Sequence, residues 1–153
     1  MAEAEVEVRV ARDEGEIGAA QEIRLQVFSR GQGIPVEGEI DGLDPESLHL
    51  VAVRRGEVVG TCRLRFPQGH CKLERMAVAD GMRGRGIGTA LAAGAEREAA
   101  RRGVDVIVLH SQRAAEGFYA ACGYVAEGET FFEEAIPHVL MRKRLRRPGG
   151  APR

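Results

Sequence analysis

The sequence contains no apolar run of the length that spans a membrane, about eighteen residues, and its net charge is only −1. This near balance of charge gives no field that would attract nucleic acid or a membrane surface. The acidic start, Met1 to Glu5, lacks the apolar segment of a signal peptide. We therefore expect a cytoplasmic protein whose partners include neither a membrane nor a nucleic acid.

Cysteine is also scarce. The three cysteines, Cys62, Cys71 and Cys122, do not have metal-ligand spacing, and no two of them form a CxxC pair. Thiols of this kind are most often small buried side chains. The sequence therefore gives no reason to expect a metal ion.

A length of 153 residues favours one domain with a hydrophobic core. We place this domain at residues 1–147 and expect a disordered tail at 148–153. The basic run Arg142–Arg147 is weak evidence for nucleic acid on a nearly neutral protein. It is more typical of a solvated edge strand followed by a frayed end.

The order of the expected elements is read from hydrophobic periodicity and turn residues. Alternating valines predict a strand at Val6–Val10, and Asp13 is a suitable cap for a helix over 14–28. The acidic, Gly- and Pro-rich segment 29–47 shows no period, and we expect a long functional loop there. Further strands are expected at 49–53, 57–66, 72–78, 104–109, 124–130 and 138–145, and further helices at 88–102 and 114–121.

This order predicts an α/β (α+β) protein with a mixed sheet that is antiparallel at first. The strand at 72–78 connects through the helix at 88–102 to the strand at 104–109, which predicts one parallel crossover. The latter strand is mostly apolar and β-branched, as is typical of a central strand buried on both faces.

The segment Arg83-Gly84-Arg85-Gly86-Ile87-Gly88-Thr89, called here the glycine loop, lies between an expected strand and a long alanine-rich helix. Its glycines let a ligand approach the backbone closely, since no Cβ stands in the way. The helix that follows directs its free N–H groups and the positive end of its dipole at the same place. Together they predict an anion site, most naturally for a phosphate or a pyrophosphate.

Two nucleotide-binding motifs do not fit this loop. A P-loop needs a lysine before its Ser or Thr, but Thr89 follows Gly88 directly. A dinucleotide fingerprint needs G-x-G-x-x-G/A, and its last position is Thr89 when counted from Gly84 and Leu91 when counted from Gly86. A plain turn with a helix cap would need one glycine, whereas this loop has three.

The loop does match Arg/Gln-x-x-Gly-x-Gly/Ala, as Arg83-x-x-Gly86-x-Gly88. Further along, Gln112-x-x-Ala115-x-x-Phe118-Tyr119-x-x-x-Gly123-Tyr124 is similar to Asn-x-x-Ala-x-x-Phe-Tyr-x-x-x-Gly-Phe/Tyr, with glutamine in place of asparagine. These two motifs in this order resemble the GNAT superfamily of N-acetyltransferases, and the resemblance extends from about His49 to Leu145.

A finer resemblance is to the ElaA-like and YjcF-like members of that superfamily. The chain departs from their pattern at Gly31, where glutamate is usual, and at Ala135, where glycine is usual; the first departure removes a carboxylate from the expected substrate wall. The residues that carry the finer resemblance are Val27-Phe28, Gln32-Gly33-Ile34-Pro35, Asp41, Asp44, His49, Leu109-His110-Ser111-Gln112 and Ile136-Pro137-His138.

The resemblance implies the GNAT fold, with helices on both faces of a mixed, mostly antiparallel sheet, and acetyl-CoA as co-substrate. It implies that N–H groups of the glycine loop face the pyrophosphate, and that the strand edge 76–78 pairs with the pantetheine arm and polarises the thioester. The residues implied in cofactor binding are Met76, Ala77, Val78, Arg83, Gly84, Arg85, Gly86, Ile87, Gly88, Thr89, Gln112 and Phe118.

The resemblance also places Tyr119 where the family's general acid protonates the leaving thiolate; the alternative is a core tyrosine on an amphipathic helix. An alkyl amine is mostly protonated at neutral pH, so a proton acceptor is needed. Glu74 is a candidate for this general base, and the alternative is a strand residue paired with Arg63 or Arg65.

Further candidates for the substrate side are His110, His138 and Gln32, and the two histidines are also alternatives for the base. The acceptor would be a small-molecule or peptide amine. The acidic side chains of segment 29–47 would suit a cationic amine, although such residues are often only solvated; they are Glu37, Glu39, Asp41 and Asp44.

We therefore predict an N-acetyltransferase that uses direct transfer in a ternary complex, since the chain shows no identifiable nucleophile. Two alternatives stay open: a non-catalytic acyl-CoA-binding or regulatory module, and a transferase for a different acyl group. The sequence does not decide whether the protein forms a homodimer.

Overall fold

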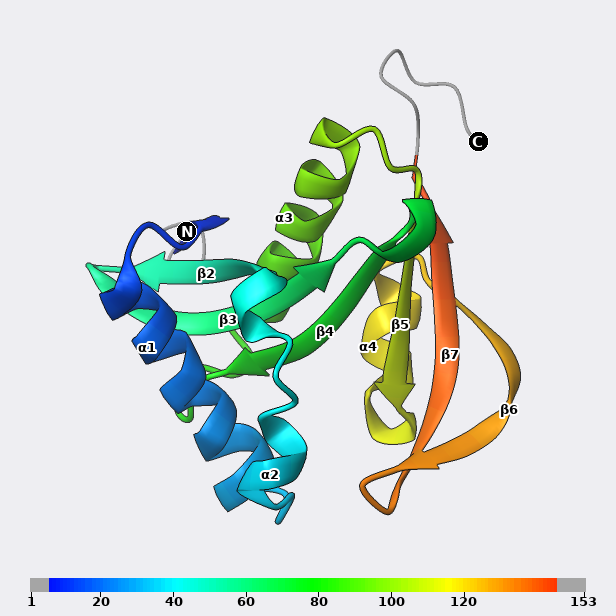
Figure 1. Ribbon diagram of the computed structural model, residues 1–153, viewed down its shortest axis with the longest axis horizontal. Coiled ribbons are helices and arrows are strands. Elements are labelled where there is room, and N and C mark those ends of the chain that lie inside the picture. Colours follow the sequence, from blue (N-terminus) through cyan, green and yellow to red (C-terminus); the bar gives the residue numbers. More distant parts are fainter. Residues whose placement is uncertain (1–5, 146–153) are drawn as a thin grey trace. The chain divides into compact units, whose positions relative to one another are not determined.

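The computed structural model describes residues 6–145, so the expected tail at 148–153 and the domain end at 147 lie outside the described residues (Figure 1). The strands form one mixed sheet in the order β1-β2-β3-β4-β5-β7-β6. They are β1 (Val6–Val10), β2 (Leu48–Arg54), β3 (Glu57–Arg65), β4 (Cys71–Val78), β5 (Val106–Gln112), β6 (Val125–Glu133) and β7 (Ile136–Arg144). The α-helices are α1 (Glu14–Arg24), α2 (Val36–Glu39), α3 (Ile87–Arg101) and α4 (Glu116–Ala121).

The chain forms two compact units. Unit 1 combines the residues up to 64 with 75–95, and unit 2 combines 65–74 with the residues from 96 onward. None of the helices in the described part of the chain has the length and apolar character that a membrane crossing requires.

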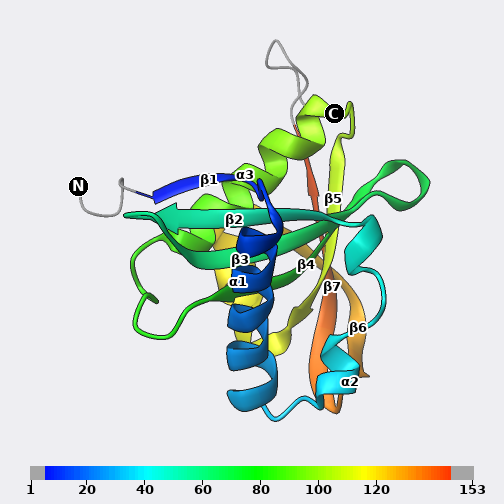
Figure 2. The ribbon, with the colours of Figure 1, turned by 60° about the vertical axis from the view of Figure 1, so that its left-hand side comes forward.

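In unit 1, β1, β2 and β3 pair antiparallel, with an irregularity between Ala52 and Val53. Helix α1 covers one face of these strands, and the first turns of α3 cover the other (Figure 2). The core between them is apolar and almost fully buried: it includes Leu50, Val51, Leu64, Ile87 and Leu91. The expectation of helices on both faces is confirmed.

In unit 2, β5 is a central strand. It pairs parallel with β4, where Cys71–Leu73 face Ile107–Leu109, and antiparallel with β7, which in turn pairs with β6. The parallel crossover through α3 is therefore confirmed. Lys143 of β7 donates from Nζ to Glu96 of α3 and to the carbonyl of Cys122, each at 2.7 Å, which ties α3 and α4 to one face of these strands.

The first helix is shorter and less regular than expected. Asp13 caps it as predicted, since its Oδ1 accepts from the amide of Glu16 at 2.9 Å. The α-helix ends at Arg24, and a π-helix follows over Leu25–Arg30. Gly31 closes this wider turn: a Cβ there would lie 2.7 Å from the carbonyl oxygen of Val27, so any side chain at this position would disturb the turn.

Three other expectations are corrected. Segment 29–47 is not one irregular loop, because it contains α2 and a 3₁₀ turn at Asp44–Glu46. The basic run from Arg142 does not begin in an edge strand, because β7 lies between β5 and β6, and β6 forms the edge. Strand β5 also extends past Leu109 to Gln112, since its last residues pair with β7.

Candidate active site

The glycine loop joins the end of β4 to the start of α3. Gly84 and Gly86 adopt φ angles of +78° and +82°, the left-handed region that glycine enters without a Cβ penalty. The carbonyl oxygen of Gly86 accepts from the amide of Ala90 at 3.0 Å, so the helix begins directly at the loop. The first amides of α3 lack partners within the helix and are available to an anion.

A tight contact in unit 1 fixes where this loop ends. Ile87, the residue after Gly86, is 2% exposed and packs into the core. A Cβ on Gly60 of β3 would lie 2.9 Å from Cγ2 of Ile87 and 3.1 Å from Cδ1 of Leu91, so Gly60 lets the helix approach the strand closely. Ile87 can therefore face a ligand only through its backbone.

The arginines of the loop are at the surface. The guanidinium of Arg83 lies 3.2 Å from the carboxylate of Asp80, and both side chains are more than half exposed. Arg85 is exposed as well. Both can reach a charged ligand without leaving a buried position.

Before the loop, β4 contains a backbone irregularity. Arg75 has a φ angle of +57°, which is uncommon for any residue other than glycine and is found at strained or functional positions. The residues that follow are the predicted cofactor edge. Met76 and Val78 are half-buried, whereas Ala77 is 3% exposed and belongs to the core.

In unit 2, β5 ends at Gln112, and a 3₁₀ turn leads into α4. Tyr119 on this helix is 8% exposed. Its ring makes edge contacts with Phe118 and Tyr124, with centroids 4.9 Å and 5.8 Å apart. These contacts hold the phenol in one place, which both a general acid and a core tyrosine would need.

Glu74 forms a bidentate pair with an arginine. Its Oε1 and Oε2 accept from Nε and Nη2 of Arg65, each at 2.9 Å, and Nζ of Lys72 is 3.4 Å away. Glu74 is therefore ion-paired with Arg65, as the alternative interpretation expected. A carboxylate that accepts two charge-assisted hydrogen bonds is a weak proton acceptor.

The two candidate histidines meet at a third residue that the sequence did not single out. Nδ1 of His110 lies 2.7 Å from Oε2 of Glu133, and Nε2 of His138 lies 3.7 Å from Oε1 of the same side chain. Phe131 contacts both imidazole rings. Glu133 lies on another strand, so only the strand register brings it here, and no local pattern could have indicated it.

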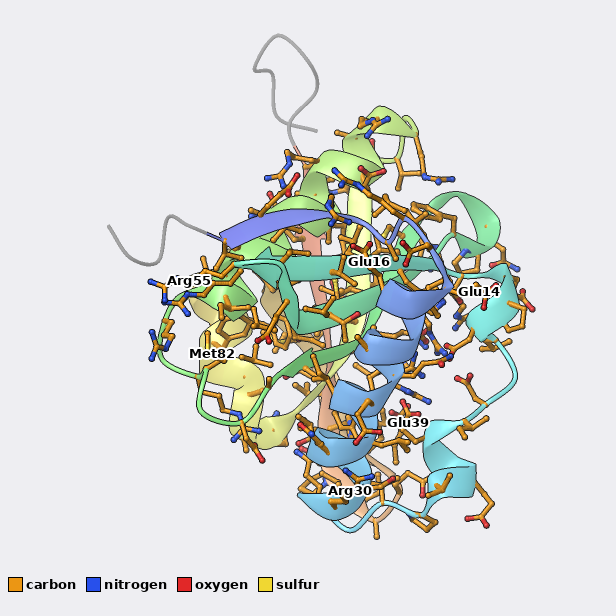
Figure 3. The ribbon with its side chains drawn as sticks, turned by 90° about the vertical axis from the view of Figure 1, so that its left-hand side faces the viewer. Glu14, Glu16, Arg30, Glu39, Arg55 and Met82 are labelled. Carbon is orange, nitrogen blue, oxygen red and sulfur yellow. The ribbon has the colours of Figure 1, made fainter. Side chains whose placement is uncertain are left out.

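The acidic segment 29–47 is mostly engaged by arginines of unit 1. Glu39 accepts from Nε of the buried Arg24 at 2.6 Å, and Figure 3 shows it beside α1. Asp41 accepts from Nη1 and Nη2 of Arg63 at 2.9 Å and 2.8 Å. The expectation that these carboxylates are solvated or available to a cationic amine is therefore corrected for both residues.

Asp44 belongs to the same network. It accepts from Nη1 of Arg63 at 2.9 Å and from Nη1 of Arg24 at 3.0 Å. Burial tends to raise the pKa of Asp44, but these hydrogen bonds outweigh it and the pKa is lowered. Of the other candidate side chains in the segment, Gln32 and Glu37 are exposed.

A mixed sheet with helices on both faces, and a glycine loop that leads from β4 into α3, define the class of acyl-CoA-dependent N-acyltransferases. A family model for the acetyltransferase (GNAT) domain matches residues 10–145, and the chain belongs to that family. The family resemblance seen in the two motifs is confirmed.

Individual relatives agree with this assignment. The uncharacterized N-acetyltransferase YjcF of Bacillus subtilis (strain 168) is 36% identical over 135 residues, which cover 88% of this chain and 96% of the relative. An acyl-CoA N-acyltransferase from Pseudomonas aeruginosa superposes with a TM-score of 0.80 at 30% identity, over 90% of this chain and 99% of that chain. A GNAT acetyltransferase from Elizabethkingia anophelis with acetyl-CoA bound shares the fold, with a TM-score of 0.73 at 16% identity over 92% and 99% of the two chains.

Proposed function

We propose that this enzyme transfers an acetyl group from acetyl-CoA to a primary amine by direct transfer in a ternary complex. The observation that carries the proposal is the glycine loop, in which two left-handed glycines lead into the first turn of α3. A Cβ at Gly84 or Gly86 would meet nothing within 4 Å, so the space beside the loop is open to a ligand. These residues fit a pyrophosphate group.

Within this proposal, the amides of residues 83–89 bind the pyrophosphate, and Arg83 and Arg85 add charge-assisted contacts from the surface. Backbone groups of the edge 76–78 orient the pantetheine arm and polarise the thioester carbonyl. Gln112 and Phe118 complete the cofactor contacts. Acetyl-CoA then supplies an activated acetyl group with a thiolate as leaving group.

Tyr119 would donate its phenolic proton to the departing thiolate. Because a thiolate is a fair leaving group at neutral pH, with a pKa of about 8.5 for an ordinary thiol, this proton assists the step without being indispensable. The amine must lose a proton as it attacks. Glu74 stays a candidate for this acceptor, although its pairing with Arg65 weakens it as a base.

The cysteines support direct transfer rather than an acetyl-enzyme. Cys62 and Cys71 are 1% and 0% exposed. Burial raises the pKa of Cys71 to about 12, and burial also raises the pKa of Cys122. A thiol that stays protonated is a poor nucleophile, so neither Cys71 nor Cys122 is suited to carry the acetyl group.

The test is the release of free CoA from acetyl-CoA with tyramine, spermidine and lysine as acceptors, together with the intact mass of the enzyme during turnover. We expect CoA release with at least one amine and no acetylated enzyme. Binding of acetyl-CoA without release would instead favour an acyl-CoA-binding module. Faster release from a longer acyl-CoA would favour a different acyl group.

A pair of matched variants tests the role of the loop. Gly86 and Gly56 both have positive φ angles, +82° and +80°, with open space around them, but only Gly86 lies in the glycine loop. Gly86→Ala and Gly56→Ala should lose similar stability, about 1 kcal/mol. Only Gly86→Ala should raise the KM for acetyl-CoA, and an equal KM in both variants would contradict the assigned site.

A further inference from the structure

We infer that His110 is the residue that accepts the proton from the attacking amine, and that Glu133 is the positioning residue that holds it. This inference rests on the proposed function, because it names the base for that reaction. It is carried by the geometry of unit 2 alone, in which both residues lie on one face of the strands β5, β7 and β6.

The strand register fixes this face. His110 faces Leu140 and Gln112 faces His138 across β5 and β7, and His138 faces Phe131 across β7 and β6. Residues that face one another in register have side chains on the same side of a sheet, and so do residues two apart on one strand. Glu133, two residues after Phe131, is thereby placed beside both histidines.

The hydrogen bond between His110 and Glu133 determines which imidazole nitrogen can accept a proton. A carboxylate only accepts, so the Nδ1 atom of His110 carries the hydrogen in the 2.7 Å contact. In the neutral imidazole, Nε2 then has the lone pair. The side chain of His110 is 32% exposed, so an incoming amine has access to it.

His138 is less suited to this role. Its Nδ1 donates to the carbonyl oxygen of Ile136 at 2.7 Å, and its side chain is only 10% exposed. Phe131 stacks on its ring, with centroids 6.0 Å apart, and makes an edge contact with His110 at 5.0 Å. His138 and Phe131 thus pack beside His110 and Glu133.

His110 lies at the same level of the sheet as Glu74. The parallel pairing of β4 with β5 ends at Leu73 and Leu109, and the next residues along the two strands are Glu74 and His110. Both side chains therefore point to the face opposite the buried Leu73 and Leu109. Of these two candidates, Glu74 is held by Arg65, whereas no hydrogen bond to Nε2 of His110 is recorded among residues 6–145.

The proposed acid lies on the other side of β5. Lys143 faces Ile107 in register, so its side chain lies on the face of the sheet opposite His110. Lys143 donates to the carbonyl of Cys122, at the end of α4. This helix carries Tyr119. An acid and a base on opposite faces suit a transfer in which the amine arrives from one side and the thiol departs toward the other.

The step balances as follows. The amine nitrogen forms a bond to the thioester carbon, and Nε2 of His110 takes the proton that the nitrogen loses. The carbon–sulfur bond breaks, the electron pair leaves on sulfur, and Tyr119 supplies the proton that makes the free thiol. Solvent then returns a proton to Tyr119 and removes one from His110, while the Glu133 carboxylate stabilises the transient imidazolium.

The experiment compares His110→Ala, Glu133→Gln and Glu74→Gln with His70→Ala, which removes a half-buried histidine from the turn after β3 in the same unit. We expect His110→Ala to lower kcat by about 100-fold or more and Glu133→Gln by about 10-fold, with the KM for acetyl-CoA nearly unchanged. Imidazole added to His110→Ala should restore part of kcat. His70→Ala should match the wild type.

A readout without substrate accompanies the kinetics. The ¹⁵N shifts of the imidazole in the wild-type protein should show His110 with its hydrogen on Nδ1. The opposite tautomer, an undiminished kcat in His110→Ala, or a loss seen only in Glu74→Gln would each overturn the inference. Absence of CoA release by the wild type with every amine would overturn the proposed function as well, so the two failures are distinct.

Discussion

Arg63 of β3, which is 0% exposed, binds both carboxylate oxygens of Asp41, from Nη1 at 2.9 Å and from Nη2 at 2.8 Å. The same guanidinium reaches Asp44, so one buried arginine anchors two points of the segment between the π-helix and β2. A buried charge of this kind is tolerated only when it is fully paired. Ion pairs with Arg63 therefore hold this segment to β3.

These ion pairs predict how stability depends on acid. Hydrogen bonds from Arg63 hold the pKa of Asp41 well below its ordinary value of 3.8, and the pKa of Asp44 is lowered as well. A lowered native pKa contributes stability that is fully present above 3.8 and is lost as the pH falls toward the native value. The free energy of unfolding should therefore decrease as the pH falls below 3.8.

Urea denaturation at several pH values between neutral and strongly acidic measures this effect. Asp41→Asn should be less stable than the wild type at neutral pH by about 1–3 kcal/mol and should lose less stability on acidification. Parallel pH dependences of the two proteins would contradict the role assigned to this pair.

The close approach of Gly60 to Ile87 predicts that a methyl group here affects both stability and cofactor binding. Gly60→Ala should cost about 1–3 kcal/mol, since the added carbon forces Ile87 and Leu91 to move. Because Ile87 lies within the glycine loop, the KM for acetyl-CoA should also rise. Thermal unfolding and steady-state kinetics measure the two effects.

Gly18 provides the control for this substitution. It lies in α1 of the same unit, and a Cβ there would meet nothing within 4 Å. Gly18→Ala should stabilise the helix by up to about 1 kcal/mol and leave KM unchanged. A Gly60→Ala variant that is as stable as the wild type would show that the contact is not tight in solution.

Tyr119→Phe should lower kcat by about 10- to 100-fold without abolishing activity, because the thiolate can leave without a proton. The KM for acetyl-CoA should change little, since the ring and its contacts are kept. Tyr124→Phe removes a hydroxyl from a neighbouring ring that is also buried, and it should retain most activity. Equal losses in the two variants, measured by CoA release, would argue for a structural role of Tyr119.

Cys71 should be inert in the folded protein. Its thiol is 0% exposed, and burial raises its pKa to about 12, so almost no thiolate exists at neutral pH. Iodoacetamide followed by peptide mass spectrometry should label Cys71 only after unfolding and should label the half-buried Cys122 first. Rapid labelling of Cys71 in the native state would reopen the question of a thiol nucleophile.

The turn between β6 and β7 carries a strained alanine. Glu134 and Ala135 have φ angles of +51° and +63°, in the region that favours glycine. Ala135→Gly should therefore stabilise the protein by about 1 kcal/mol, measured as an increase in Tm.

The converse substitution checks the sign of this effect. Gly128 of β6 has a φ angle of +79° and open space around it, so Gly128→Ala should destabilise the protein by a similar amount. A Tm for Ala135→Gly below that of the wild type would show that the loss of side-chain contacts outweighs the relief of strain.

Much of the fold followed from local patterns. The alternating valines of β1, the cap at Asp13 and the crossover through α3 were all predicted, because each depends on residues close in sequence. The π-helix after Arg24 and the central place of β7 were not, because the first depends on a crowded turn at Gly31 and the second on strand pairing across the sheet.

The candidate site divides in the same way. The glycine loop and the motif from Gln112 to Tyr124 are contiguous segments, so they could be located from residue spacing and compared with the motifs of the family. The roles of Tyr119 and Glu74 stay predictions. The pairing of Glu74 with Arg65 was one of two interpretations before the structure, and the structure adds the bidentate geometry that makes it a weak base.

The sequence by itself determined the family and predicted an anion site at the glycine loop, because a glycine-rich loop before a helix is set by its own few residues and by the amides that follow them. Only the tertiary structure decided which charged side chains are engaged. Arg63 meets Asp41, and His110 meets Glu133, across segments that are far apart in the chain. Such partners are chosen by strand register and burial, and neither leaves a mark in the local spacing of residues.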